Sequence, residues 1–411
     1  MKVIYFHQHF TTPQVGGGIR SYELAQRLIR MGHQVIMVTG GNKEKYDLPE
    51  TKKKNVYRGN IDGIDVIQIA LPYSNSDGLF KRALTFIKFA VKSIHYAMHE
   101  DYDIAFATTT PLTAGIPCIW AKWFRGKKYV FEVRDLWPEL PKALGMKNPI
   151  ALWGMSLLEK LSYVNACACV GLSPGICEGI ARRSQKNKDI ALIPNGCDLG
   201  LFTPGCREDL KIDGILPTDK VAVFTGAHGR ANGLNAVLDA AKVLLDRGRK
   251  DIKFVFVGDG KLKPILKERA QKEKLINCLF LGHMPKAELS KIICSADIGL
   301  QILANIPAFY YGTSPNKFFD YITAGRPVLN NYPGWLADMI KENKCGIVVE
   351  PNNPAAFADG IIYLADNPSL RKEYGNNARA LAEREFDRDK LGMQFVDFIG
   401  QAYHKYCVKE K

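Results

Sequence analysis

The sequence predicts an α/β fold made of two Rossmann-like domains in series, each built on a parallel β-sheet. Its 411 residues exceed the usual length of a single-domain core. Short β-branched and aromatic runs recur along the chain, and each is followed by a helical pattern. Near-continuous apolar strands that alternate with helices are typical of parallel sheets covered on both faces.

The expected strands fall into two sets separated by a segment rich in Pro, Asn and Gly, 193–205, which predicts the linker. We therefore expect an N-terminal domain over 1–195 and a C-terminal domain over 196–385. The last helical segment, about 386–411, should pack back across the first domain. The first set of strands is 2–8, 34–39, 103–108, 128–135 and 166–173, and the second is 221–227, 252–258, 278–282, 297–302 and 327–330.

The cysteines, the first residues and the net charge indicate which class of protein this is. The ten cysteines include no CxxC pair, which argues against a zinc cluster or a disulfide framework and favours reduced thiols. The strand-like Val3–Phe6 begins directly after the first two residues, so we expect no signal peptide and a cytoplasmic location. A net charge of +14, concentrated in the first half, predicts a surface that faces something anionic.

Three consecutive glycines, Gly16, Gly17 and Gly18, follow the first strand and precede a helix expected over 19–31. Bare backbone NH groups at a helix N-terminus attract phosphate, so we predict contact with a phosphate or a substrate. The alternative is a flexible strand-to-helix turn. The loop is not the dinucleotide fingerprint, because the second strand ends without an acidic residue, and a nicotinamide-dependent oxidoreductase is therefore disfavoured.

The run from Ser314 to Val328 predicts a turn, a short helix beginning near Pro315 and a return to a strand. A carboxylate on that helix, Asp320, can accept two hydrogen bonds from a ribose diol. The alternative is a solvated acid paired with Lys317, three residues earlier on the same helix.

Several motifs, in order along almost the whole chain, resemble the retaining family-4 glycosyltransferases of the GT-B fold. The resemblance rests on Ile193–Gly196, Phe256–Gly260, Phe280–His283, Ala296–Gly299 and Asn316–Val328. The segment Phe131–Glu139 and the Gly16–Gly18 loop are similar to a bacterial O-antigen and capsule branch that includes L-fucosamine transferases. The resemblance implies a nucleotide-sugar donor, with UDP as the expected nucleotide, bound in a cleft between the domains.

The resemblance also implies which residues bind the donor. Asp320 takes the place of the second Glu of the family's Glu-x7-Glu motif, while the first falls on Gly312. The family's Arg and Lys for the diphosphate are missing, so we expect Arg230 to take over, aided by Lys317. The expected donor-binding residues are Gly16, Gly17, Gly18, Arg230, Gly258, Asp259, His283, Ser314, Asn316, Lys317 and Asp320.

The expected catalytic residues are Arg134, Asp135 and Glu132, at the end of the 128–135 strand, where many relatives carry a His-Asp pair. Arg134 remains protonated and cannot act as a base, so it is expected to bind a phosphate of the donor or of a lipid-linked acceptor. Asp135 or Glu132 would orient the acceptor hydroxyl. The alternative is a structural ion pair at the strand end.

No metal site and no cofactor are expected; the Asp101-Tyr102-Asp103 triplet is read as a solvated turn.

Lys81, Lys88 and Lys92 lie along one face of the helical segment 80–94, which predicts either contact with an anionic membrane or an ordinary solvated helix. A polyprenyl-diphosphate-linked sugar acceptor would account for this charge, and a saccharide acceptor is the alternative. The lack of an aromatic stacking motif among the basic residues disfavours nucleic acid.

The sequence leaves two alternatives open. One is a nucleotide-sugar epimerase or hydrolase of the same fold. The other is a non-catalytic relative that binds a nucleotide sugar, which the missing Glu and the missing basic pair favour. Turnover of a donor by the purified protein separates a sensor from an enzyme.

Overall fold

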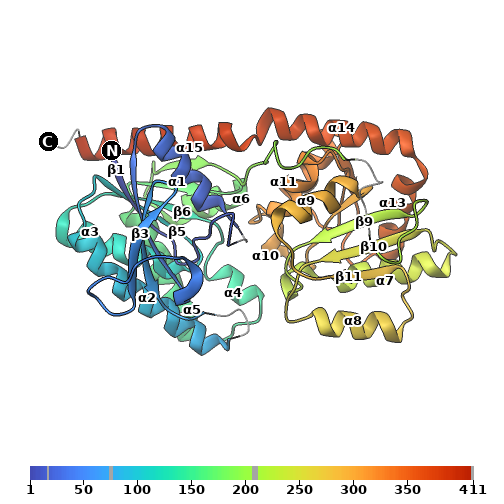
Figure 1. The fold of residues 1–411 in the computed structure, drawn as a ribbon, viewed down its shortest axis with the longest axis horizontal. Coiled ribbons are helices and arrows are strands. Elements are labelled where there is room, and N and C mark those ends of the chain that lie inside the picture. The colour runs from blue at the N-terminus through green and yellow to red at the C-terminus, as the bar shows by residue number, and fades with distance from the viewer. Residues whose placement is uncertain (16–17, 74–76, 206–211, 409–411) are drawn as a thin grey trace. The chain divides into compact units, whose positions relative to one another are not determined.

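The computed structural model describes residues 1–15, 18–73, 77–205 and 212–408. The chain forms two compact units, shown in Figure 1. Unit 1 comprises Met1–Pro194 and Asp389–Lys411, and unit 2 comprises Asn195–Arg388. The linker segment thus contains the division at Pro194, and the C-terminal segment belongs with the first unit. Each unit has its own sheet and its own core.

Unit 1 contains an eight-stranded sheet in the order β3-β4-β2-β1-β5-β6-β7-β8. Strand β1 is central, and its residues Val3–Phe6 are fully buried, as expected for a strand covered on both faces. All the pairings are parallel except that of β3 with β4. The strands are β1 Lys2–Phe6, β2 Gln34–Gly41, β3 Val56–Ile61, β4 Ile64–Ala70, β5 Ile104–Thr108, β6 Tyr129–Val133, β7 Ala168–Gly171 and β8 Asp189–Leu192.

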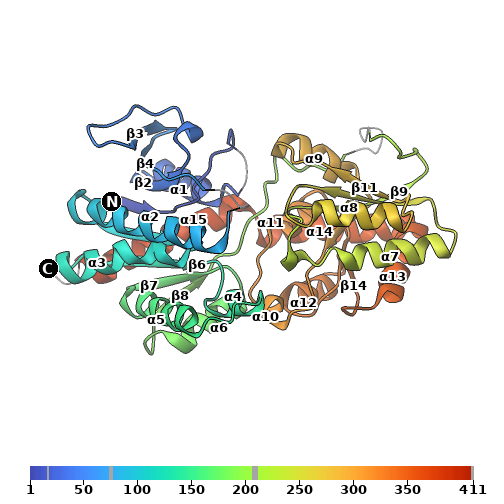
Figure 2. The same ribbon diagram turned by 90° about the horizontal axis from the view of Figure 1, so that it is seen from below.

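Helices cover both faces of this sheet. Helices α2, α3 and α5 lie side by side on one face, which is turned toward the viewer in Figure 2, and α1 and α15 lie on the other. The ring of Phe395 on α15 packs edge-on against Phe106 of β5, with centroids 5.0 Å apart. The helices of unit 1 are α1 Arg20–Arg30, η1 Lys43–Lys45, α2 Leu79–His99, η2 Leu112–Gly115, α3 Ile116–Arg125, α4 Glu139–Ala143, α5 Pro149–Asn165, α6 Pro174–Arg183, α15 Arg388–Tyr403 and η5 His404–Val408.

The edge of the unit 1 sheet differs from the all-parallel prediction. Strands β3 and β4 form an antiparallel hairpin that the sequence analysis missed. Its turn is Asp62-Gly63, and both residues have positive φ, 49° and 87°, as a type I′ turn requires. The sheet is therefore mixed, with the hairpin as its edge.

Unit 2 contains a six-stranded parallel sheet in the order β11-β10-β9-β12-β13-β14. Its strands are β9 Lys220–Thr225, β10 Ile252–Val257, β11 Cys278–Leu281, β12 Ile298–Gln301, β13 Val328–Asn330 and β14 Gly346–Val348. Its helices are η4 Arg230–Asn232, α7 Asn235–Asp246, α8 Lys263–Lys272, α9 Lys286–Ser295, α10 Pro307–Tyr310, α11 Asn316–Thr323, α12 Trp335–Glu342, α13 Pro354–Asp366 and α14 Pro368–Glu385.

The prediction of two Rossmann-like α/β domains is confirmed, although the sequence analysis did not anticipate β3, β4, β8 and β14. Across the part of the chain that the structure describes, no helix is both long enough and apolar enough to span a bilayer. The expected strands and observed strands agree to within a few residues at each end. What positions a site in such a fold is the set of loops at the carboxyl ends of the strands.

Candidate functional site

In unit 2, the loops that follow β9 and β10 pack directly on each other. A Cβ atom at Gly258 would lie 2.1 Å from the Gly226 carbonyl oxygen, and one at Gly260 would lie 2.6 Å from that of His228. Both glycines also have positive φ, 134° and 157°. Only glycine allows the two loops to approach this closely. Their backbones therefore pack directly against each other at the carboxyl end of the sheet.

Lys317, in the first turn of α11, extends its amine to the end of β9. The amine donates a hydrogen bond to Asn232 Oδ1 at 2.7 Å and lies 4.0 Å from the centroid of the Phe224 ring. A Cβ atom at Gly226 would lie 3.6 Å from Lys317 Nζ, so the amine sits over the glycine turn. Burial lowers the pKa of Lys317 to about 7. An anion at this turn would restore the charge on the amine.

Asp320 lies one turn further along α11 and is almost fully buried. Its Oδ1 is 3.3 Å from Nζ of Lys286, at the start of α9. The expected alternative partner, Lys317, bonds instead to Asn232. Burial raises the pKa of Asp320, although the charge and hydrogen bond of Lys286 act in the opposite direction. The carboxylate is therefore held by a cation from a neighbouring helix.

The other donor-binding candidates surround this end of the sheet. Ser314 is tied to Asn195, whose backbone NH donates to Ser314 Oγ at 3.1 Å and whose amide donates to the Ser314 carbonyl at 2.5 Å. Asp259 follows β10, and its Oδ1 accepts from the NH of Gly260. Exposed side chains at this end are Arg230 on η4, Asp259, His283 after β11 and Asn316 at the start of α11.

His228, between β9 and η4, is a residue that the sequence analysis did not single out. It is fully buried among the rings of Phe224, Phe256 and Phe280, and within the part of the chain that the structure describes neither of its ring nitrogens has a hydrogen-bond partner. Burial lowers its pKa to about 4, and Lys263 contributes in the same direction. The imidazole is therefore neutral and fills the space beneath the glycine loops.

In unit 1, the predicted Glu132 lies within β6 and is fully buried. Its Oε1 accepts bonds from Nε and Nη2 of Arg20 at 3.0 and 2.8 Å, and its Oε2 accepts from Thr108 Oγ1 at 2.6 Å. Arg20 also donates to the carbonyls of Ile193 and Pro194. Burial raises the pKa of Glu132, but the charges of Arg20 and Arg134 outweigh burial, so the net pKa is lowered. Glu132 thus holds Arg20 of α1 against β6, and Arg20 in turn bonds the chain at Ile193 and Pro194.

Arg134 and Asp135 directly follow β6 and are only half-buried. The Arg134 backbone NH donates to Thr109 Oγ1 at 2.8 Å, and Thr110 Oγ1 donates to Asp135 Oδ2 at 3.0 Å. Burial raises the pKa of Asp135, while Thr110 and the charge of Arg134 act to lower it. The loop after β5 therefore fixes the backbone of Arg134 and the carboxylate of Asp135. Of the predicted glycine loop, Gly16 and Gly17 lie outside the described residues, and the carbonyl of Gly18 accepts a bond from Thr11.

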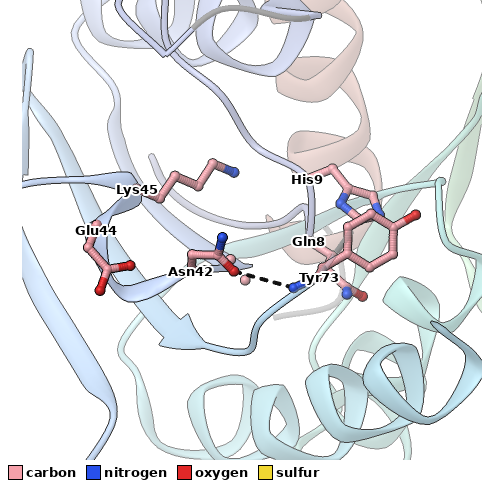
Figure 3. Close-up of a pocket in the computed structure, with 8 residues that line it drawn as sticks. Gln8, His9, Asn42, Glu44, Lys45 and Tyr73 are labelled. Carbon is pink, nitrogen blue, oxygen red and sulfur yellow. Dashed lines mark hydrogen bonds between the residues drawn. The ribbon is translucent and has the colours of Figure 1, made fainter. Parts of the chain in front are cut away.

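A pocket of about 320 Å³ lies at the carboxyl ends of β1 and β2, and Figure 3 shows the residues that surround it. The sequence analysis did not identify it as a pocket. The glycine pair that ends β2 is the signal that would have revealed it, because two glycines at a strand end leave room beside the sheet. Its lining residues are Gln8, His9, Gly40, Gly41, Asn42, Glu44, Lys45 and Tyr73.

Comparison with known families assigns each half of the chain. Residues 15–196 match the glycosyl transferase 4-like domain, and residues 207–381 match the glycosyl transferases of group 1. An uncharacterized glycosyltransferase of Methanocaldococcus jannaschii is 23% identical over 408 residues, which cover 94% of each chain. The alpha-D-kanosaminyltransferase of Streptomyces kanamyceticus is 24% identical over 61% of this chain and 63% of its own.

Solved structures share the fold over nearly the whole chain. A sucrose-phosphate synthase from Thermosynechococcus elongatus superposes with a TM-score of 0.76 at 18% identity, covering 98% of this chain and 99% of that one. HepE of Anabaena, in complex with UDP-glucose, superposes with a TM-score of 0.70 at 15% identity, covering 98% and 100%. The two-domain architecture is therefore that of the GT-B glycosyltransferases.

Proposed function

Since its two halves match the glycosyl transferase 4-like and group 1 families, the chain belongs to the GT-B glycosyltransferases, and we propose that it transfers a sugar from a nucleoside-diphosphate donor to a saccharide acceptor. Unit 2 would hold the donor and unit 1 the acceptor. The observation that carries the proposal is the Lys317 amine over the Gly226 turn, with Asp320 one turn along the same helix.

Lys317 and Arg230 would neutralise the diphosphate of the donor. The Lys317 amine is a compact, desolvated charge, so its attraction for an anion is strong, whereas the Arg230 side chain is exposed and presents a planar fork of donors. The backbone NH groups of the glycine turn after β9 add neutral donors. This grouping would replace the family's missing basic pair.

Asp320 would accept the ribose diol, with Lys286 holding its carboxylate in the ionised form. Gly258, Asp259, His283, Ser314 and Asn316 complete the donor-binding set at the same end of the sheet. We propose UDP as the nucleotide, since HepE was solved in complex with UDP-glucose. An N-acetylated amino or deoxy sugar is the proposed group transferred, in surface polysaccharide synthesis of the O-antigen or capsule type, because the branch that the sequence resembles includes L-fucosamine transferases.

The proposed reaction retains the anomeric configuration. The bond from the anomeric carbon to the diphosphate oxygen breaks as the acceptor oxygen bonds to the same face. The acceptor proton passes to the departing phosphate, so no protein base is required. Cations at the diphosphate stabilise the negative charge that develops there, and such stabilisation acts on the transition state more than on the ground state. Transfer with inversion, seen by NMR of the product linkage, would refute this mechanism.

On unit 1, Arg134 and Asp135 would face the reacting groups, Arg134 binding a phosphate and Asp135 orienting the acceptor hydroxyl. Glu132 is better described as a positioning residue, because both its oxygens are engaged by Arg20 and Thr108. Its role would be to fix the strand that carries Arg134 and Asp135. No metal and no cofactor enter the proposed step.

We also propose that the enzyme acts at an anionic membrane, where a polyprenyl-diphosphate-linked acceptor would be found. Helices α2, α3 and α5, which lie side by side, contain a single acidic residue, Glu159, and it is fully buried. Helix α2 also carries the exposed lysines Lys81, Lys88 and Lys92. Their exposed apolar side chains, the outer apolar face, are Phe80, Leu84, Ile87, Val91, Trp120, Trp123, Phe124, Ile150, Trp153 and Leu157.

Such a combination of exposed Trp and Phe with lysines is typical of surfaces that lie in the headgroup region of a bilayer. Each basic residue near an anionic membrane contributes about 1 kcal/mol to binding. The outer apolar face would place unit 1, the proposed acceptor unit, against the lipid that carries the acceptor.

The donor site is tested by titrating the protein with UDP and with uridine. The variant Asp320→Asn should weaken both ligands by about tenfold, since it removes a charged hydrogen-bond acceptor from the ribose. Asp338→Asn, an exposed acid on α12, is the control and should change neither. Unchanged affinity of Asp320→Asn for both ligands would remove the ribose assignment.

Incubation with a panel of nucleotide sugars then separates the enzyme classes. A transferase releases nucleotide faster when an acceptor is added, a hydrolase releases it at the same rate without acceptor, and an epimerase converts the donor sugar without releasing nucleotide. Binding of a donor with no turnover under any of these conditions would identify a non-catalytic sensor.

A further inference from the structure

The pocket after β1 and β2 has an aromatic wall suited to a sugar ring. The ring of Tyr73 stacks on Phe86 with centroids 5.7 Å apart, and His9 lies 4.7 Å from Tyr73. Figure 3 shows Tyr73 and His9 together on one side of the pocket, with Asn42 and Lys45 facing them. Aromatic faces of this kind pack on the apolar face of a pyranose, while amides bond its hydroxyls.

Glycines keep the floor of the pocket open. A Cβ atom at Gly41 would lie 2.8 Å from Lys45 Cδ, and one at Gly40 would lie 3.2 Å from Gln8 Cγ. Gly41 also has a φ of 141°, which other residues rarely adopt. The end of β2 therefore makes room for the side chain of Lys45 to lie across the pocket.

Cations surround this wall. Lys45 directs its amine into the pocket, where the Phe10 carbonyl accepts one of its three protons. The guanidinium of Arg82 lies 5.7 Å from the Tyr73 centroid. Burial, together with the charges of Lys45, Arg82 and Arg134, lowers the pKa of His9 to about 4, so the imidazole is neutral and adds no charge of its own. The acidic lining residue, Glu44, is exposed, and its carboxylate points away from the Lys45 amine (Figure 3).

Among the residues that the structure describes, three buried polar atoms in and beside the pocket have no hydrogen-bond partner. They are Oε1 of Gln8, Nδ1 of His7 and Nε of Arg82. Gln8 is 2% exposed and His7 is 3% exposed. Because an unpaired buried donor or acceptor costs free energy, such atoms mark the place where a bound ligand supplies hydrogen bonds.

We propose that this pocket binds an anionic sugar, a pyranose carrying a carboxylate or a phosphate, with Lys45 and Arg82 holding the anionic group and Tyr73 and His9 packing on the ring. Gln8 and Asn42 would bond the hydroxyls. The inference rests on the proposed function in one respect only, that this ligand is the acceptor. A neutral sugar could accept hydrogen bonds from these donors but would leave the charges of Lys45 and Arg82 uncompensated.

The first experiment measures binding to the donor-free protein by saturation-transfer NMR, using glucuronate, glucose 6-phosphate and glucose as probes. Either anionic probe should bind about tenfold more tightly than glucose, as expected for one charge-assisted hydrogen bond. Preference for glucuronate assigns a uronic acid acceptor, and preference for the phosphate assigns a sugar phosphate. Equal affinity for all three would overturn the proposal.

The second experiment uses the variants Lys45→Met and Arg82→Gln, with Lys43→Met as the control. Lys43 lies on the same η1 turn but does not line the pocket. Lys45 lines the pocket, and Arg82 lies beside it, over the Tyr73 ring. Both of these pocket variants should lose the preference for the anionic probe, and the control should keep it. The thermal unfolding transition of unit 1, which contains all three positions, must match that of the unaltered protein in every variant, which shows that they are folded. Retained preference in both pocket variants would refute the role of these cations.

These measurements do not require turnover. If the protein binds glucuronate in this pocket and yet transfers no sugar, the pocket assignment stands and the proposed function fails. If it transfers sugar to neutral acceptors alone and binds no anionic probe, the proposed function stands and the pocket assignment fails.

Discussion

At the scale of single residues, Lys317 is an ammonium group held where water is scarce. Its pKa of about 7, against an ordinary value of 10.5, means that the unfolded chain binds more protons than the folded chain between these two pH values. The free energy of unfolding should therefore rise with pH across this window. Burying the Lys317 amine thus lowers the free energy of unfolding when no ligand is bound, as is common for residues that bind a ligand.

The variant Lys317→Met should remove this cost. We expect the variant to be more stable than the unaltered protein at pH 6, with the difference disappearing as the pH approaches 10.5. Urea unfolding at several pH values measures it. The same variant should weaken UDP by about tenfold and leave uridine binding unchanged, because the amine contacts the diphosphate and not the ribose. Parallel pH profiles for the two proteins would show that Lys317 is not desolvated in the folded state.

Some of these residues were accessible from sequence, and others were not. Lys317 and Asp320 stand in one motif, so they could be named without coordinates. Lys286 could not, because it is 34 residues from Asp320 and meets it only through the packing of α9 on α11. The unpaired ring nitrogens of His228 likewise depend on burial among rings that three different strands contribute.

At the scale of elements, most strands of both sheets could be predicted because buried parallel strands are near-continuous apolar runs, whereas the short and only partly buried β8 and β14 were missed. The β3–β4 hairpin was missed, although Asp62-Gly63 is a strong turn signal, because its strands mix polar and apolar residues as an edge does. Helix α2 was predicted to be amphipathic. The exposure of Trp123 on α3 and Trp153 on α5 could not be predicted, because it depends on which face of each helix packs on the sheet and which face is left uncovered.

The outer apolar face gives a prediction at this scale. The double variant Trp123→Ser, Trp153→Ser should bind vesicles that contain phosphatidylglycerol about tenfold more weakly, since two large interfacial side chains are lost. Tyr363→Ser, which removes an exposed aromatic residue from α13 of unit 2, should have no effect. Flotation and tryptophan fluorescence measure binding. Equal flotation of the double variant, or failure of the unaltered protein to bind these vesicles, would contradict the membrane proposal.

At the scale of the whole molecule, the chain leaves unit 1 at Pro194 and returns to it at Asp389, so the C-terminal helix belongs to the first core. Phe395 of α15 is fully buried against Phe106, and Arg27 of α1 forms an ion pair with Asp389. Unit 2 is thus an insertion between two parts of unit 1. The two cores share no residues among their buried clusters, so each can unfold as a unit of its own.

Calorimetry should separate these two cores by their response to a ligand and to a core mutation. UDP at 100 times its dissociation constant should raise the free energy of unfolding of unit 2 by about 2.7 kcal/mol, because it binds only the folded unit. The midpoint temperature of that transition rises accordingly. Phe395→Ala should lower the free energy of unfolding of unit 1 by about 3 to 5 kcal/mol, because it leaves a cavity in the core. Met393→Ala, at an exposed position on the same helix, serves as the control. If Phe395→Ala lowered the UDP-sensitive transition instead, α15 would have to stabilise unit 2, and the division of the chain at Asp389 would be wrong.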